Sequence, residues 1–285
     1  MKPVPTHLPP GLYLVSTPIG NARDITLRAL DILSSADVIA AEDTRTARKL
    51  MQIHAIPTGG RPIIAYHDHS GENGRAGLVR LVAEGKSVAY VSEAGTPLVS
   101  DPGYALARDV ARGGHLVTAA PGASAVLAAL AVSGLPSDRF LFAGFPPSQA
   151  AARKKWLAEL ADVPATLAFY ESPRRVRELF NDLVQTFGKD RQAALCRELT
   201  KKFEEVIRGP LGTVCEIVNN REIKGEIVVL VGRGRQSVAE ETMEDALRRA
   251  MKEMSLKDAA ALVAEAYGLP KRKVYQAALE LEPDK

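Results

Sequence analysis

The chain has 285 residues, 46% of them hydrophobic and 25% charged, which is typical of a globular protein long enough for two domains. Its two cysteines, Cys196 and Cys215, are too few for a disulfide scaffold or a cysteine zinc cluster, and they fit a reducing cytoplasm. No apolar run approaches about 18 residues, so we expect no membrane-spanning helix. The proline-rich leader MKPVPTHLPP predicts an extended arm, not a signal peptide.

Strand and helix patterns alternate regularly through the first half of the chain. Short apolar runs predict strands at residues 11–16, 38–42, 62–68, 87–92 and 115–120. Amphipathic runs predict helices at residues 25–36, 44–55, 74–85, 104–114 and 124–134. Apolar strands alternating with helices of this length indicate a parallel sheet covered on both faces. We therefore predict an α/β fold whose first domain spans residues 1–122.

The regular alternation of strand and helix ends near residue 139, and beyond it the expected strands follow one another with fewer helices between them. Strands are expected at residues 139–145, 166–170, 192–199, 202–209 and 225–234, and helices at residues 150–160, 174–188 and 210–220. Ser172 is expected to cap the helix that begins at Pro173. This order predicts a mixed sheet in a second α/β domain over residues 123–235, with a cleft where the two domains meet.

Three short helical patterns follow a linker-like segment, and they define a third unit over residues 236–285. The helices are expected at residues 241–254, 255–267 and 271–281, with a capping box of Ser255 and Asp258 at the second. Lys271 and Arg272 open the last helix, as in a helix-turn-helix unit that binds nucleic acid. A bundle for docking or dimerisation is an equally good interpretation, because this segment is net acidic.

Small-residue turns follow three of the strands, in the segments 16–21, 91–103 and 120–126. Gly95, Gly103 and Gly122 permit sharp bends or a close approach to a ligand, and the carboxyl ends of parallel strands are where an open α/β sheet binds its ligand. The first turn lacks G-x-G-x-x-G, and no Walker lysine motif occurs, so pyrophosphate recognition is not expected. Backbone groups and apolar walls suit an adenosine joined to a sulfonium amino acid.

The runs LVSTPIGN, AAEDTR, SEAGTPLVSDPG, PGASAV and FYESPRR, in this order, resemble the tetrapyrrole methylase superfamily. Within it, the chain resembles the ribosomal RNA small subunit methyltransferase I branch. The resemblance implies a homodimer of two α/β domains that binds S-adenosylmethionine between them. It also implies 2′-O-methylation of a cytidine in the decoding region of 16S RNA, within the small ribosomal subunit. Thr96 stands where tetrapyrrole-modifying members have Asp, which argues against a corrin-type substrate.

Carried over position by position, the resemblance implies a set of cofactor contacts. They are Pro18, Glu93, Gly95, Thr96, Pro97, Val99, Ser100, Ser124, Ala125, Tyr170, Glu171 and Leu199.

Methyl transfer to a ribose hydroxyl benefits from a base or a nearby cation, and charged side chains at strand ends are the candidates. We expect catalytic groups among Glu42, Asp43, Arg45 and Asp101. Helix N-capping is the alternative role for Asp43 and Asp101. The sequence does not choose between them.

Basic clusters in the middle and at the end of the chain could contact phosphate, since residues 151–235 hold 16 basic against 12 acidic side chains. We expect RNA contacts at Arg174, Arg175, Lys201, Lys271 and Arg272, with Arg153, Lys154, Lys155 and Lys273 as further candidates. Solvated surface is the alternative for each of them. The run His67-Asp68-His69 lacks a third ligand nearby, so no metal is expected.

Three functions therefore compete: an RNA ribose methyltransferase, a methylase of a tetrapyrrole or another small acidic substrate, and a non-enzymatic nucleic-acid-binding protein. The branch motifs favour the first.

Overall fold

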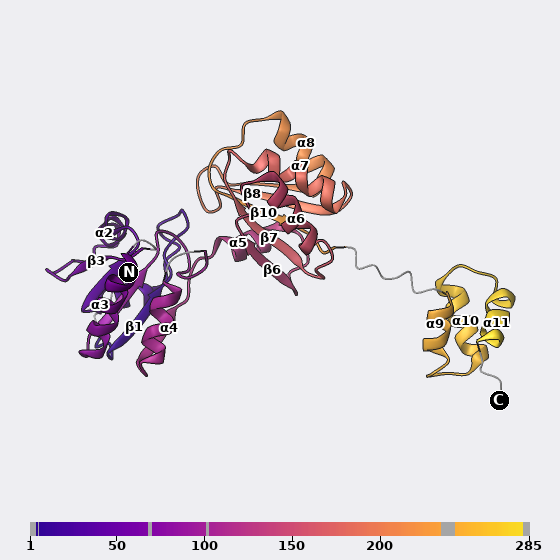
Figure 1. Ribbon diagram of the computed structural model, residues 1–285, viewed down its shortest axis with the longest axis horizontal. Coiled ribbons are helices and arrows are strands. Elements are labelled where there is room, and N and C mark those ends of the chain that lie inside the picture. The colour runs from indigo at the N-terminus through magenta and orange to yellow at the C-terminus, as the bar shows by residue number, and fades with distance from the viewer. Residues whose placement is uncertain (1–3, 5, 68–69, 101–102, 235–242, 282–285) are drawn as a thin grey trace. The chain divides into compact units, whose positions relative to one another are not determined.

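The computed structural model describes residues 4, 6–67, 70–100, 103–234 and 243–281. They form two compact units, one of residues 1–161 and 165–233 and one of residues 162–164 and 234–285 (Figure 1). The first unit holds two five-stranded sheets, and the second holds three helices. The α/β prediction with a trihelical end is confirmed. The predicted boundary between residues 122 and 123 stays a prediction.

The first sheet is wholly parallel, with strand order β3-β2-β4-β1-β5. Its strands are β1 (Gly11–Val15), β2 (Val38–Ala41), β3 (Ile63–Ala65), β4 (Ser87–Val91) and β5 (Leu116–Ala120). Every residue of the central strand β4 is buried, which is why its sequence SVAYV is almost continuously apolar.

Helices cover both faces of this sheet, as the alternating pattern predicts. Residues of α1 (Leu27–Ser35) and α2 (Thr44–Ile53) pack in one apolar cluster with Tyr13, Ile39 and Ala89. Residues of α3 (Gly71–Ala83) and α4 (Tyr104–Arg112) pack in a second cluster with Leu12 and Tyr90. Adjacent residues of one strand thus enter different clusters, because successive side chains point to opposite faces.

The second sheet is mixed, with strand order β6-β7-β10-β8-β9. Its strands are β6 (Phe140–Gly144), β7 (Thr166–Glu171), β8 (Gln192–Arg197), β9 (Glu205–Pro210) and β10 (Ile227–Val231). Of the hydrogen-bonded neighbours in this sheet, β6 and β7 pair in parallel, and the other three pairs are antiparallel. The accompanying helices are α5 (Ala125–Ser133), α6 (Ala150–Leu160), α7 (Val176–Phe187) and α8 (Leu211–Asn220).

Helix α7 begins later than its sequence pattern suggests. Arg175 occupies the N-cap, and the backbone N–H groups of Arg175 and Val176 both donate to the carbonyl of Ser172. The predicted cap at Ser172 is therefore wrong, because residues 173–175 form a turn before the helix.

The trihelical unit consists of α9 (Met243–Ala250), α10 (Leu256–Ala266) and α11 (Lys271–Glu280), around a core that includes Leu247, Val263 and Val274. The cap at Ser255 is confirmed: the N–H of Asp258 donates to the Ser255 hydroxyl at 3.3 Å, and this hydroxyl donates to the Asp258 carboxylate at 2.6 Å. Most of the predicted linker lies outside the described residues. Among the helices that the structure describes, none is long and apolar enough to cross a membrane.

Candidate active site

The three small-residue turns meet at one edge of the parallel sheet. Val15, the last residue of β1, lies level with Val91 on β4 and with Ala120 on β5. Beyond these ends, Thr17 and Gly95 exchange two backbone hydrogen bonds of 2.9 and 3.1 Å. The first and second turns are thereby joined into one rigid rim.

Side-chain hydroxyls join the third turn to the other two. Thr96 Oγ1 donates to the carbonyl of Ala123 at 3.0 Å and lies 3.3 Å from the Ser16 hydroxyl. A Cβ at Gly122 would lie 2.7 Å from the Ser16 Cβ, so only glycine allows the turns to approach this closely. Gly95 has a φ of +85°, a left-handed conformation that L side chains rarely adopt.

A cavity of about 690 Å³ opens against this rim and is also lined by residues of the second sheet. This size is in the range of small-molecule and cofactor sites. Ten of the twelve residues expected at the cofactor line it: Pro18, Glu93, Gly95, Thr96, Val99, Ser124, Ala125, Tyr170, Glu171 and Leu199. Pro97 and Ser100 do not line it.

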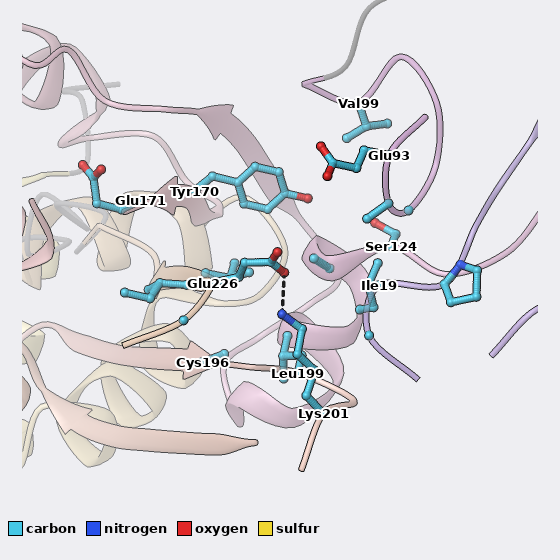
Figure 2. Close-up of a pocket in the computed structure, with 18 of the residues that line it drawn as sticks. Ile19, Glu93, Val99, Ser124, Tyr170, Glu171, Cys196, Leu199, Lys201 and Glu226 are labelled. Carbon is cyan, nitrogen blue, oxygen red and sulfur yellow. Dashed lines mark ion pairs between the residues drawn. The ribbon is translucent and has the colours of Figure 1, made fainter. Parts of the chain in front are cut away.

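The second sheet contributes an aromatic wall to the cavity. Figure 2 shows the Tyr170 ring projecting into the cavity, whereas the Glu171 carboxylate points away from that ring, as strand alternation requires. The Tyr170 ring packs edge-on against Phe142, with centroids 4.8 Å apart, and against Phe145, with centroids 5.5 Å apart. Sequence reasoning missed Phe145, although its position at the end of an expected strand was a usable signal.

Charged groups pair along another part of the lining. Lys201 Nζ lies 3.0 Å from Glu226, as Figure 2 shows, and 2.9 Å from Glu198. Burial lowers the pKa of Lys201, but hydrogen bonds to the two carboxylates outweigh this and raise the pKa overall. Lys201, expected to contact RNA, thus lines the cavity as a paired cation. Sequence reasoning missed Glu226, because this residue reaches the cavity only through the position of β10 between β7 and β8 in the second sheet.

Cys196 also lines the cavity, and its thiol is buried. Desolvation raises the pKa of this thiol to about 12, so the group is neutral and unreactive near pH 7. Its role in the wall is that of a small apolar side chain.

The four candidate catalytic residues are placed differently. Glu42 lines the cavity, and its carboxylate accepts the backbone N–H of Glu93 at 3.0 Å. Asp43 and Arg45 do not line the cavity. Asp43 caps α2 by accepting the N–H of Arg45 at 2.7 Å, and the hydrogen-bonded Arg45 side chain lowers the pKa of Asp43 to about 2. Asp101 lies outside the described residues.

The neighbouring residues Arg174 and Arg175 have unlike surroundings. Arg175 lies 2.7 Å from the Glu171 carboxylate, whose side chain is completely buried. Arg174 is exposed, as are Lys271 and Arg272 at the start of α11. Arg174 is therefore more accessible to phosphate than Arg175.

Arg153 is buried, which corrects its inclusion among the RNA candidates. Only 2% of its side chain is exposed, and its guanidinium lies 2.7 Å from Asp182 and 3.2 Å from Glu178. It also donates to the carbonyls of Pro147 and Ser148. The basic run of residues 153–155 misled the sequence argument because one helix turn presents its residues to both core and solvent.

Metal ligation finds no support among the residues that the structure describes, which contain no group of three or more candidate ligands. His67 bonds Ser70 through its backbone N–H at 2.8 Å, whereas Asp68 and His69 lie outside the described residues.

Comparisons with known proteins agree with this architecture. The family model for tetrapyrrole (corrin/porphyrin) methylases matches residues 11–215, and that for the RsmI C-terminal HTH domain matches residues 237–282. A solved uroporphyrin-III C-methyltransferase from Thermus thermophilus, complexed with S-adenosyl homocysteine, shares the fold with a TM-score of 0.54 and 20% identity. That similarity covers 78% of this chain and 97% of the other.

Curated relatives are similar over nearly the whole chain. A ribosomal RNA small subunit methyltransferase I from Mesorhizobium japonicum is 46% identical over 277 residues, covering 96% of this chain and 93% of the relative. One from Vibrio cholerae is 45% identical over 285 residues, covering 98% and 97%. The chain belongs to the tetrapyrrole (corrin/porphyrin) methylase family and, within it, to the ribosomal RNA small subunit methyltransferase I branch.

Proposed function

We propose that the chain is an S-adenosylmethionine-dependent methyltransferase that modifies RNA of the small ribosomal subunit. The observation that carries this proposal is the cavity at the carboxyl edge of the parallel sheet, lined by the rim of three hydrogen-bonded turns. The names of relatives at 45–46% identity support ribosomal RNA as the substrate.

The lining fits an adenosyl sulfonium compound in size and chemistry. Gly95 has no side chain and lets a ligand approach the rim closely, Ser124 and Ala125 offer little bulk, and Tyr170 offers an aromatic face. When bound, S-adenosylmethionine supplies an electrophilic methyl group on a positively charged sulfur. Pro97 and Ser100 stay proposed contacts, although the cavity lining does not include them.

The finer proposal is that the accepting group is the 2′-hydroxyl of a cytidine in the decoding region of 16S RNA. It is supported by the branch motifs of the sequence. The in-line displacement requires mainly positioning, and then removal of the hydroxyl proton. Among the described candidates Glu42 is best placed to accept that proton, because its carboxylate belongs to a cavity-lining residue at the rim. Asp43, Arg45 and Asp101 remain proposed catalytic residues.

The surrounding RNA requires cations outside the cavity. Arg174, Lys271 and Arg272 are exposed and suit this role, whereas Arg175 and Lys201 are held by carboxylates. We further propose that the chain acts as a homodimer in the cytoplasm, with α/β domains at residues 1–122 and 123–235 and an RNA-binding unit at 236–285. The family resemblance supports these proposals, and light scattering at micromolar concentrations would test the dimer.

The test is transfer of a radiolabelled methyl group from S-adenosylmethionine to reconstituted 30S subunits that contain transcribed 16S RNA. Free 16S RNA and a uroporphyrinogen are offered in parallel. Nuclease digestion and mass spectrometry should show 2′-O-methylcytidine as the labelled product. Label on the base would overturn the 2′-O assignment, and label only on the tetrapyrrole would overturn the RNA substrate.

A further inference from the structure

Phe145 is a large aromatic residue that remains exposed at the cavity. It lines the cavity, yet 56% of its surface is accessible to solvent. Its ring meets Tyr170 edge-on, at 5.5 Å between centroids and an angle of 63°. Phe145 directly follows β6, and Tyr170 lies on the neighbouring parallel strand β7, so the second sheet alone builds the pair.

The segment that carries Phe145 bends just before this residue and is anchored after it. Before it, Gly144 has a φ of +72°, and the register of β6 against β7 shifts between Phe142 and Gly144. After it, the Arg153 guanidinium donates to the carbonyls of Pro147 and Ser148, at 3.4 and 3.1 Å.

Arg153 is in turn fixed by its ion pairs with Asp182 and Glu178, at 2.7 and 3.2 Å. The exposed ring of Phe145 is therefore presented by a rigid support and is not the tip of a loose loop.

We propose that Phe145 is the stacking platform for the base of the nucleotide whose ribose is methylated, an inference that rests on the proposed function. Aromatic faces are sequence-tolerant stacking partners for unpaired bases, and enzymes that modify a nucleotide expose it from its surroundings. Tyr170 meets the Phe145 ring at an angle and not face to face, and 56% of the Phe145 surface stays accessible to a base. Phe145 thus determines how the target nucleotide is held, while the rim turns hold the cofactor.

The test compares Phe145→Ala, Phe145→Trp and wild type in methyl transfer to 30S subunits, with S-adenosylmethionine affinity measured by calorimetry. Phe145→Ala should lower kcat/KM for the subunits by about 5- to 150-fold, the range expected for one lost base stack. Phe145→Trp should restore most of the activity, and both variants should bind S-adenosylmethionine like wild type. Phe203→Ala is the matched control, because Phe203 is 64% exposed and does not line the cavity.

Each other result overturns the proposal in a recognisable way. Weaker S-adenosylmethionine binding by Phe145→Ala would assign the ring to the cofactor. Unchanged transfer by Phe145→Ala, or equal losses in Phe145→Ala and Phe145→Trp with normal melting curves, would exclude stacking. If wild type transfers no methyl group to subunits or RNA, the proposed function itself fails, and this inference fails with it.

Discussion

Two adjacent arginines should respond in opposite ways when each is replaced by alanine. The guanidinium of Arg175 lies 2.7 Å from the Glu171 carboxylate, and its Nε donates to the same oxygen at 2.8 Å. The other oxygen, Glu171 Oε2, is buried and has no hydrogen-bond partner within the described part of the chain. Arg174, one residue earlier, is exposed. R175A should therefore destabilise the fold, whereas R174A should weaken RNA binding.

The magnitude follows from what R175A leaves behind. Removing one partner of a buried ion pair costs about 3–5 kcal/mol, because the remaining charge is buried without compensation. The Arg175 side chain is 29% exposed and water can partly replace it, which reduces our expectation to about 2–4 kcal/mol. For a unit of this size, Tm should fall by at least about 4 °C.

Urea unfolding and RNA filter binding together test this expectation. R174A should unfold like wild type, within about 0.5 kcal/mol, and should reduce the slope of log K against log salt by about 1. Adding E171Q to R175A should recover part of the lost stability, because a neutral amide replaces the unpaired charge. If R175A unfolded like wild type and lost salt dependence instead, the assignment of the two arginines would be wrong.

Three further predictions concern Gly95 at the rim, the thiol of Cys196 and the carboxylate of Asp43. G95L should abolish S-adenosylmethionine binding in calorimetry and cost about 1–2 kcal/mol through its left-handed φ, whereas G77A, in open space on α3, should do neither. Cys196, with a thiol pKa near 12, should resist iodoacetamide at pH 8 until urea unfolds the chain, as peptide mass spectrometry would show. The thiol of the unfolded chain ionises at a lower pH than the buried thiol of the folded chain, so the free energy of unfolding should fall as pH rises from about 9 to 12. C196A should remove this part of the pH dependence. The pKa of Asp43 is near 2, so this carboxylate does not change its charge between about pH 5 and 8. If the methyl-transfer rate falls with pH in that range, the midpoint of the fall should be the same in D43N as in wild type. A shifted midpoint would show that Asp43 takes part in the reaction.

Local patterns were sufficient to predict the architecture and the rim of the site. The period of apolar residues identified the parallel sheet, and glycine at the strand ends identified the turns that line the cavity. Gly95 and Thr96 were expected there, and both line it. The helix cap at Ser255 was also predictable, because Ser255 and Asp258 are three residues apart. The late start of α7 was not, because Pro173 suits both the first turn of a helix and the separate turn that the structure shows at residues 173–175.

The tertiary structure alone decided which charged side chains are available for function. Arg153 reads as part of a basic cluster, but its partner Asp182 is 29 residues away and lies on another helix. Arg174 and Arg175 look alike in sequence, yet only one faces the buried carboxylate of Glu171. The physical reason is that burial depends on how the elements pack: Asp182 lies on another helix than Arg153, and Glu171, although only four residues from Arg175, is buried by the fold. Helix period, capping and turn formation act between near neighbours. Sequence therefore determined where the backbone forms the site, and folding determined which side chains are free to use it.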